Sequence, residues 1–352
     1  MHSIKHILAC IDAPDPDNFV MLIALSLMYP NAKIYVLLTS RPVNFRADRS
    51  TKLWDFDLES SLMAQQASAL RIKNFLKHFG IEVIHVYDGG IAPRTLVPHW
   101  VHFQDYYKFL DNDPLKALRH SELDNQEDLI KIILGIIEAG EQVHVAVGGP
   151  MTGLDQLITR NPDIVEAFAE VHAMFATWGN VELMNFGGAP RGASQFNVAC
   201  HPQAAYNILM GLGCPIYLMP TEVTRVANIA FETAQDLRAF LPKNDGCNAL
   251  ATLYALWYDA AVRPRQFTDP NEKLFIHDLV SAFSLNKSTR ELIYDVVPIV
   301  VDAVPHLAKD RSEWGTVMMR KVEEPGNIFS ATGLKEGGAK IYLDTLQKLL
   351  DV

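Results

Sequence analysis

The sequence predicts an α/β protein with an open, mostly parallel central sheet flanked by helices, and with a helical C-terminal lobe. Short apolar segments alternate with longer amphipathic ones up to about residue 220. The short segments are largely apolar throughout, which is typical of strands covered by helices on both faces. No repeat, low-complexity linker or break in composition divides the 352 residues, so we expect a single domain over residues 1–352.

The individual elements follow from where each apolar pattern ends in turn residues. Strands are expected at Ile4–Ile11, Lys33–Leu38, Ile81–Tyr87, Gln142–Val147, Val171–Ala176 and Pro215–Leu218. Helices are expected near Asp17–Met28, Leu58–Phe79, Gln126–Ala139, Gly153–Ile158 and Pro202–Leu212. After about residue 224 we expect mainly helices up to Ala303, then a β-like segment at Gly315–Val322 and a terminal helix near Ala339–Leu350.

Composition and charge exclude several classes of partner. The chain carries 31 Lys and Arg against 41 Asp and Glu, a net charge of −10, so a nucleic-acid backbone and an anionic membrane surface are not expected partners. The longest apolar stretch, Phe19–Tyr29, is shorter than the roughly 20 residues that cross a bilayer. The run Ile7–Ile11 is too short for a signal peptide, and four cysteines without a CxxC pattern suggest buried reduced thiols. We therefore expect a cytoplasmic protein.

An acidic turn follows the first expected strand. Asp12, Asp15 and Asp17 place three carboxylates, and Asn18 an amide, within seven residues. One interpretation is structural: Asp17 or Asn18 caps the next helix and the other aspartates lie in a turn. The other is a site for a hard cation, because clustered carboxylates repel each other unless a cation compensates them.

Two further segments carry polar groups in apolar surroundings. The turn 147–153 (VGGPMTG) leads from a strand into a helix, and its glycines would let the backbone approach a ligand closely. It fits neither a Walker A sequence nor the dinucleotide fingerprint. In the helical lobe, His277 and Asp278 stand side by side in an apolar stretch, where a buried Asp calls for a partner or a cation unless the pair lies exposed at a helix start.

Together and in this order, these segments resemble the nucleoside hydrolase family, the inosine-uridine preferring nucleoside N-ribohydrolases. Residues 17–25 are similar to the family's D-D-A-x-A-x-x-x-A, and residues 149–153 to its G-P-L-T-N turn. The remaining matches are residues 194–205 with A-E-F-N-x-x-x-D-P-E-A-A, residues 277–281 with H-D-P-L-A, and residues 316–319 with a T-V-V-D-like strand. The resemblance covers nearly the whole chain.

The resemblance implies a hydrolase that cleaves the N-glycosidic bond of a ribonucleoside or related N-riboside, giving ribose and free base, in purine or pyrimidine salvage. It implies one Ca²⁺ held by Asp12, Asp17, the Thr152 carbonyl and Asp278. The cation lowers the pKa of a bound water, whose proton passes to a carboxylate, here Asp12. The water attacks through an oxocarbenium-like transition state, while His277 assists the leaving base.

The same resemblance implies substrate-binding residues and an assembly. A homodimer or homotetramer is usual in the family, and a small nucleoside or nucleotide is the expected partner. Asn197 and Asn44 match sugar-contacting asparagines. The full set of implied substrate-binding residues is Asp15, Asn18, Asn44, Gln195, Asn197 and Arg191.

The chain departs from the family pattern in the acidic turn and near the sugar's 5′ end. If Asp17 and Asn18 match the paired aspartates, the second has become an amide; if Asp12 and Asp17 are matched instead, Pro16 replaces an aspartate. Gln195 stands where the family has Glu, and Arg191 adds a cation nearby, which suits a 5′-phosphate better than a free hydroxyl.

Two other readings of the same scaffold stay open. The altered turn favours, as the main alternative, a catalytically impaired nucleoside- or nucleotide-binding protein. Base exchange in place of hydrolysis is a third reading, but it would need a second nucleophile site, and none is identified in the sequence.

Overall fold

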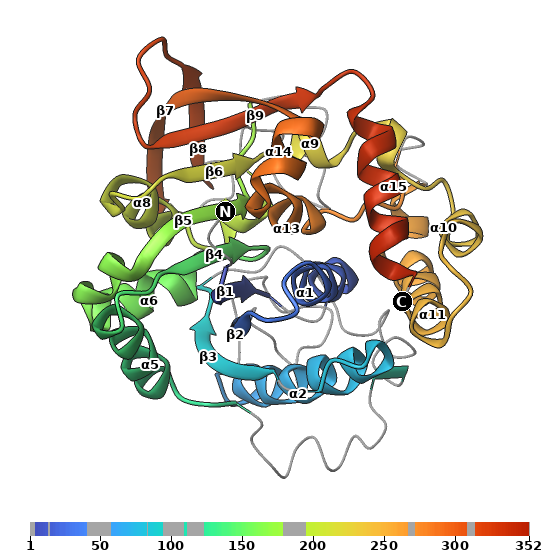
Figure 1. The fold of residues 1–352 in the computed structure, drawn as a ribbon, viewed down its shortest axis with the longest axis horizontal. Helices are drawn as coiled ribbons and strands as arrows, with labels where there is room; N and C mark the ends of the chain where they lie inside the picture. Colours follow the sequence, from blue (N-terminus) through green and yellow to red (C-terminus); the bar gives the residue numbers. More distant parts are fainter. Residues whose placement is uncertain are drawn as a thin grey trace.

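A computed structural model describes residues 4–12, 15–40, 58–82, 84–93, 109–110, 123–178, 195–266, 272–307 and 314–351. Nine strands form one sheet in the order β3-β2-β1-β4-β5-β6-β9-β7-β8 (Figure 1). Neighbouring strands are parallel from β3 to β9, whereas β7 is antiparallel to both β9 and β8. The predicted fold class, an open and mostly parallel sheet flanked by helices, is confirmed.

The strands and helices have the following bounds. The strands are β1 (His6–Ile11), β2 (Lys33–Ser40), β3 (His85–Ile91), β4 (Val143–Val147), β5 (Phe168–Met174), β6 (Ile216–Met219), β7 (Tyr294–Leu307), β8 (Trp314–Lys321) and β9 (Ile328–Leu334). The helices are α1 (Pro16–Met28), α2 (Leu58–Leu76), α5 (Gln126–Glu138), α6 (Thr152–Arg160), α7 (Phe196–Cys200), α8 (Pro202–Gly211), α9 (Thr221–Thr224), α10 (Ala234–Phe240), α11 (Asp245–Trp257), α12 (Arg263–Gln266), α13 (Leu279–Leu285), α14 (Lys287–Ile293) and α15 (Gly338–Leu350). Short 3₁₀ turns cover Lys77–Phe79, Pro162–Ala167 and Ala227–Ile229, and a π-helical turn covers Tyr258–Val262.

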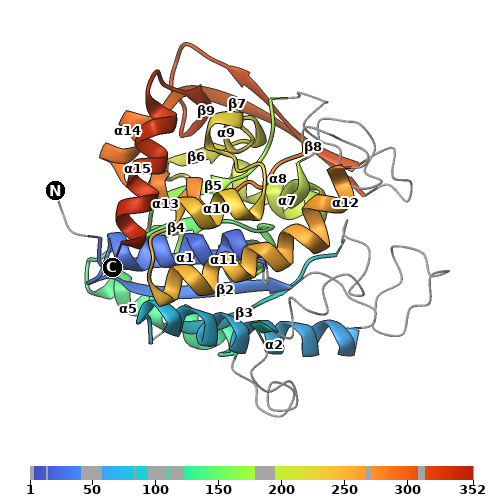
Figure 2. The ribbon, with the colours of Figure 1, turned by 90° about the vertical axis from the view of Figure 1, so that its right-hand side faces the viewer.

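Two apolar cores cover the two faces of the sheet. Along β1, Ile7, Ala9 and Ile11 point into the core that contains α1, α13 and α15, while Leu8 and Cys10 point into the core that contains α5, α6 and α8. Successive side chains of a strand point to opposite faces, so a strand covered on both faces is apolar at every position. This arrangement explains the uninterrupted apolar runs of the sequence, and Figure 2 shows α1 enclosed between the sheet and the helical lobe.

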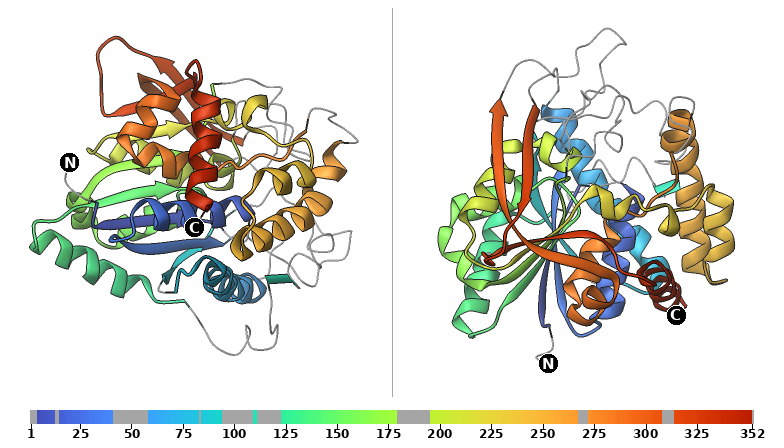
Figure 3. Two further views of the ribbon diagram at one scale, coloured as in Figure 1. Left: turned by 45° about the vertical axis from the view of Figure 1, so that its right-hand side comes forward. Right: turned by 90° about the horizontal axis from the view of Figure 1, so that it is seen from above.

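Part of the expected C-terminal lobe is not helical. Helices were expected up to Ala303, but β7 begins at Tyr294, and the sequence pattern gave no sign of β9. The run Val296–Val301 is rich in β-branched residues, which favour strands, yet an apolar run without alternation does not distinguish a strand from a buried helix. The β-like segment at Gly315–Val322 is confirmed as β8, which forms a long ribbon with β7 (Figure 3).

The third strand lies later in the chain than expected. β3 begins at His85 instead of Ile81 and continues through Gly89 and Gly90 to Ile91.

Within the described ranges, no helix combines the length and the hydrophobicity that a membrane crossing needs.

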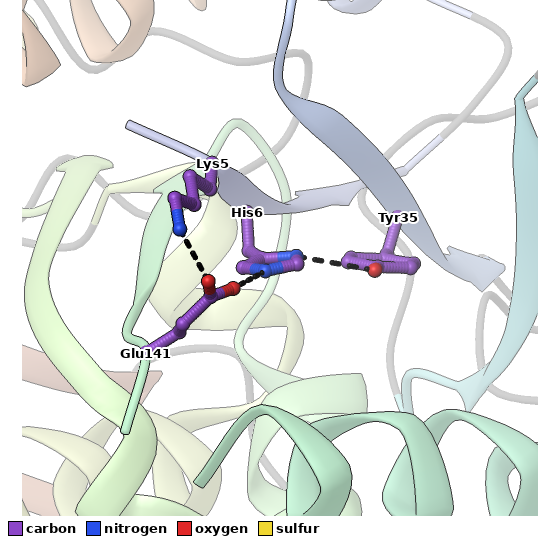
Figure 4. Close-up of polar contacts among 4 residues, drawn as sticks. All are labelled: Lys5, His6, Tyr35 and Glu141. Atoms are coloured by element: carbon purple, nitrogen blue, oxygen red, sulfur yellow. Dashed lines mark hydrogen bonds and ion pairs between the residues drawn. The ribbon is translucent and has the colours of Figure 1, made fainter. Parts of the chain in front are cut away.

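A cluster of polar side chains lies at the amino end of the sheet, opposite the carboxyl ends of the strands. The His6 ring lies between the Tyr35 hydroxyl (3.3 Å) and the Glu141 carboxylate (2.6 Å), which also pairs with Lys5 (Figure 4). Hydrogen bonds from Lys5 and His6 lower the pKa of Glu141, while burial and the Glu141 charge raise the pKa of Tyr35. The cluster joins β1 and β2 to the loop before β4.

A second polar network fastens α13 to the sheet. The fully buried His172 of β5 lies 2.8 Å from the Ser284 hydroxyl and 3.2 Å from the Glu170 carboxylate. Its ring stacks on Tyr217 (4.8 Å between centroids), and the Arg290 guanidinium lies 3.9 Å from the centroid of the Tyr217 ring. Burial lowers the pKa of His172 to about 4, against the opposing effect of Glu170. His172 is therefore neutral in the folded protein.

We expect the free energy of unfolding to fall as the pH is lowered from about 6.5 to about 4. In this range an unfolded His172 takes up a proton that the folded state excludes, so unfolding is favoured by up to about 3 kcal/mol. Urea denaturation across this pH range should show that His172→Gln has a smaller pH dependence than the wild type. The matched control is His85→Gln, because the His85 side chain is 61% exposed; equal slopes for all three proteins would contradict the assignment.

Candidate functional site

The candidate site lies where the order of strands in the sheet reverses. From β1 the chain proceeds outward through β2 and β3 on one side, and through β4, β5 and β6 on the other. Ligands of open α/β sheets bind at this switch point, outside the carboxyl ends of the strands. Asp12 follows β1 directly, and Gly148 and Gly149 follow β4 directly, so two of the predicted segments meet here.

Asp12 and Asn18 are joined by the Asn18 side chain. The Asn18 Nδ2 group donates to the Asp12 carboxylate (3.2 Å) and to the Asp12 backbone carbonyl (3.3 Å), and each of the two residues is 2% exposed. The other end of the same amide, Asn18 Oδ1, is buried without a hydrogen-bond partner among the described residues. A buried amide oxygen without a partner costs on the order of 1–3 kcal/mol, which indicates that this oxygen faces a ligand.

Asp278 reaches the same point from the opposite side of the sheet end. It precedes α13, is 3% exposed and makes no capping hydrogen bond to the described helix. A β-carbon placed on Gly148 would lie 2.8 Å from Asp278 Cγ and 2.9 Å from Asn18 Oδ1; one on Gly149 would lie 2.9 Å from Asp12 Cβ. The two glycines are therefore needed for close approach, and the three polar side chains converge on them.

The residues present fit a hard cation. Within the described ranges, no three side chains of His, Cys, Asp or Glu gather as a metal site. The converging set is instead two buried carboxylates and one carboxamide oxygen, from Asp12, Asp278 and Asn18. Two carboxylates buried at the same end of the sheet favour a compensating positive charge, and oxygen donors of this kind suit Ca²⁺ or Mg²⁺.

The other aspartates of the acidic turn lie at the margin of this set. Asp15 is the N-cap residue of α1, and its backbone carbonyl accepts a hydrogen bond from the backbone amide of Asn18 (3.2 Å). Asp17 is half-buried in the first turn of α1. Burial, and then the charges of Asp17 and Asp278, raise the pKa of Tyr342 well above its usual value. Asp17 and Asp278 thus both lie close enough to the Tyr342 hydroxyl for their charges to act on it.

Thr152, Asn197 and Gln195 surround the glycine turn. Thr152 is fully buried at the start of α6, and its hydroxyl lies 3.0 Å from the His201 ring. The Asn197 amide donates to the carbonyls of Gly148 (3.1 Å) and Met174 (3.2 Å). The side-chain oxygen of Gln195 caps α7, and its side-chain nitrogen lies against the sulfur of Met174. Asn197 and Gln195 therefore have structural partners at this position.

His277 is held by a threonine that the sequence analysis did not select. His277 Nδ1 lies 2.8 Å from Thr224 Oγ1, which also donates to the Thr221 carbonyl (3.1 Å). A hydroxyl has one proton, so it accepts from His277 Nδ1, and the neutral ring carries its proton on Nδ1. The Phe275 ring lies between His277 (5.6 Å) and the Arg225 guanidinium (5.0 Å), which is paired with the buried Glu272.

Some site residues were not selected from the sequence, and two selected ones lie outside the described residues. Ala176, after β5, has a φ of +70°, which a residue other than glycine rarely adopts and which often marks a functional site. No local sequence pattern signals this conformation. Thr224 could have been found only through its partner His277. Asn44 and Arg191 are the two candidates that lie outside the described residues.

The fold and the strand-end cluster define an α/β protein with a polar, cation-compatible site at its switch point. The chain belongs to the inosine-uridine preferring nucleoside hydrolase family, whose sequence model matches residues 60–336. The acidic turn that departs from the family pattern precedes this span. A comparison with curated protein sequences finds no match.

Solved structures of nucleoside hydrolases share the fold at low sequence identity. A nucleoside hydrolase from Bacillus anthracis superposes with a TM-score of 0.61 at 16% identity. A plant nucleoside hydrolase gives 0.66 at 14%, and a purine-preferring ribonucleoside hydrolase from Gardnerella vaginalis gives 0.62 at 14%. Each comparison covers 99% of this chain and 99% of the other. The whole chain is therefore built on this fold.

We expect Gly148→Ala to disrupt the site more than its change in volume suggests. The added methyl group would lie within 3.0 Å of Asp278 and of Asn18 Oδ1, so one of them must move. Calcium affinity, measured by calorimetry, should fall by about tenfold or more. The matched control is Gly135→Ala in α5, where nothing lies within 4 Å and alanine favours the helix; equal affinity in both variants would contradict the proposed geometry.

Proposed function

We propose that this chain is a calcium-dependent N-ribohydrolase that splits a nucleoside or related N-riboside into ribose and free base. The observation that carries the proposal is the convergence of Asn18 and Asp278 on Gly148 and of Asp12 on Gly149, with Asn18 Oδ1 buried and unpartnered among the described residues. Family membership supports the reaction class. Cytoplasmic location and assembly into a homodimer or homotetramer stay predictions from the sequence.

The ligand set that we propose is Asp12, Asp278, the Asn18 carboxamide oxygen and the Thr152 carbonyl, with Asp17 as the alternative to Asn18. When bound, Ca²⁺ would hold the ribose hydroxyls and lower the pKa of a water. Asp12 would take the proton of that water as general base. The Asn18 amide fixes the orientation of the Asp12 carboxylate, because it donates to Oδ1 at 3.2 Å.

His277 would act on the leaving base. Thr224 fixes the ring through Nδ1, so we propose that Nε2 is the atom that meets the base, and in the neutral ring that nitrogen is a hydrogen-bond acceptor. Donation of a proton from Nε2 therefore requires the doubly protonated ring. Asn197 would contact the sugar through its side-chain oxygen, because its side-chain nitrogen donates to the carbonyls of Gly148 and Met174.

Acceptance of a 5′-phosphate stays a prediction from the sequence. The absence of charge on Gln195 supports this prediction. The side-chain nitrogen of Gln195 already contacts the Met174 sulfur, and its side-chain oxygen accepts a hydrogen bond from the start of α7. Asp15, Asn44 and Arg191 stay proposed substrate contacts on the same footing.

Calcium removal tests the function. Protein purified without chelator should contain one Ca²⁺ per chain and release ribose from a panel of nucleosides. Dialysis against a chelator should abolish both, and added Ca²⁺ should restore them. Asp278→Asn should weaken calcium binding by about tenfold or more, since it removes one of two buried charges. If calcium binds but no nucleoside or nucleotide is cleaved, the chain is a ligand-binding member of the family.

Two further variants of this experiment decide which residue of the turn is the ligand. If Asn18 Oδ1 coordinates, Asn18→Asp adds a charge at the metal and should tighten calcium binding, whereas Asp17→Asn should change it little. The opposite pattern would assign the ligand to Asp17. Both substitutions are nearly isosteric, so the two variants should differ little from the wild type in packing.

We expect His277→Ala to slow the reaction according to the leaving group. With a natural nucleoside, kcat should fall by about 10²–10⁴-fold, because the departing base loses its hydrogen-bonding partner. With p-nitrophenyl riboside, whose leaving group needs no proton, kcat should fall far less. Thr224→Val, which removes the partner of Nδ1, should show the same selectivity more weakly. An equal loss on both substrates would contradict a role in leaving-group departure.

A further inference from the structure

The direct pairing of β4 with β5 stops at the end of β4. The last paired residues of this ladder are Val147 and Ala173. Beyond them the Ser281 hydroxyl accepts a hydrogen bond from the Met174 amide (2.8 Å) and donates one to the Val147 carbonyl (2.8 Å). The hydroxyl therefore takes the place of a strand-to-strand hydrogen bond and holds the two strand ends apart.

A second side chain bridges the same gap one step further along. The Asn197 amide donates to the Gly148 and Met174 carbonyls, two acceptors that cannot pair with each other. Ser281 reaches the gap from α13 and Asn197 from α7. The separation of β4 and β5 is thus set by side chains of two helices, and it lies directly beside the candidate site.

Ser281 also fixes the first turn of α13. Its backbone amide donates to the Asp278 carbonyl (3.0 Å), so the hydroxyl and the Asp278 carboxyl belong to one helical turn. The hydroxyl is anchored on Val147, and Asp278 lies against the next residue, Gly148. One turn later, Ser284 contacts His172 in the middle of β5, away from the strand ends.

We propose that Ser281 is a positioning residue for Asp278: its hydroxyl, inserted between β4 and β5, sets the distance between the Asp278 carboxyl and the end of β4. This inference rests on the proposed function, in which Asp278 is a calcium ligand. A serine suits this position because it is small and both accepts and donates. Alanine would leave the Met174 amide and the Val147 carbonyl without this partner in a fully buried place, and the strand ends and α13 would shift to pair or hydrate them.

The test compares Ser281→Ala with Ser284→Ala. Both remove a fully buried, hydrogen-bonded hydroxyl from the same helix, so both should lower Tm by a similar amount. Calcium titration by calorimetry should show Kd raised on the order of 10- to 100-fold in Ser281→Ala, as for other residues that orient metal ligands, with Ser284→Ala close to the wild type. Equal Kd values in the two variants would overturn the inference.

Hydrogen exchange separates failure of this inference from failure of the proposed function. If the wild type binds no calcium, the proposed function fails. The role of the Ser281 hydroxyl is then tested by hydrogen exchange in the metal-free protein. Exchange of the Met174 amide should then be faster in Ser281→Ala than in the wild type and Ser284→Ala. Equal rates in the three proteins would show that the hydroxyl does not hold the strand ends, and would overturn the inference.

Discussion

The close approach of Asp278 and Asn18 to the Gly148 backbone is the contact on which the rest of the site depends. Any side chain at Gly148 would displace one of them, and Gly149 admits Asp12 in the same way. The two glycines therefore let three elements, the end of β1, the start of α1 and the start of α13, meet at the end of β4. The surrounding framework keeps them there: Asn197 holds the Gly148 carbonyl, Ser281 holds Val147, and His172 with Ser284 fastens α13 to β5.

The same packing creates the electrostatic problem that the site has to solve. The sheet is apolar on both faces, and α1 is buried from Asn18 to Leu25, so the polar groups at the strand ends have little access to water. Asn18 satisfies part of Asp12, but its own oxygen lies, like the Asp278 carboxyl, against Gly148. Two buried carboxylates and an unpartnered oxygen are stable together when a cation lies between them. The fold thus supplies the geometry, and the cation that we propose would supply the compensation.

This chain keeps the family fold while changing its acidic turn. Solved relatives share the fold over 99% of the chain at 14–16% identity, and the family match begins at residue 60, beyond the turn. In the alignment that matches Asn18 to an aspartate of the family, the amide leaves the proposed site with less negative charge. Affinity for calcium depends on the number of charged ligands, so this substitution acts on the metal rather than on the scaffold. For the calcium site that we propose, the expected consequence is weaker binding on an intact fold.

The sequence by itself determined the parallel half of the sheet, because strands covered on both faces are apolar at every position and stand out between amphipathic helices. It also identified the acidic turn, the glycine turn and the His277–Asp278 pair, since each places polar groups next to apolar runs. Only the tertiary structure decided that β7 and β9 are strands, because a short apolar run satisfies either structure until its neighbours are known. It also decided that Asn18 and Asp278 both lie against Gly148, and that Ser281 bridges β4 and β5 beyond their last pair. The Ser281–Val147 contact alone joins residues 134 positions apart, and no local pattern encodes which distant group a hydroxyl or an amide will meet.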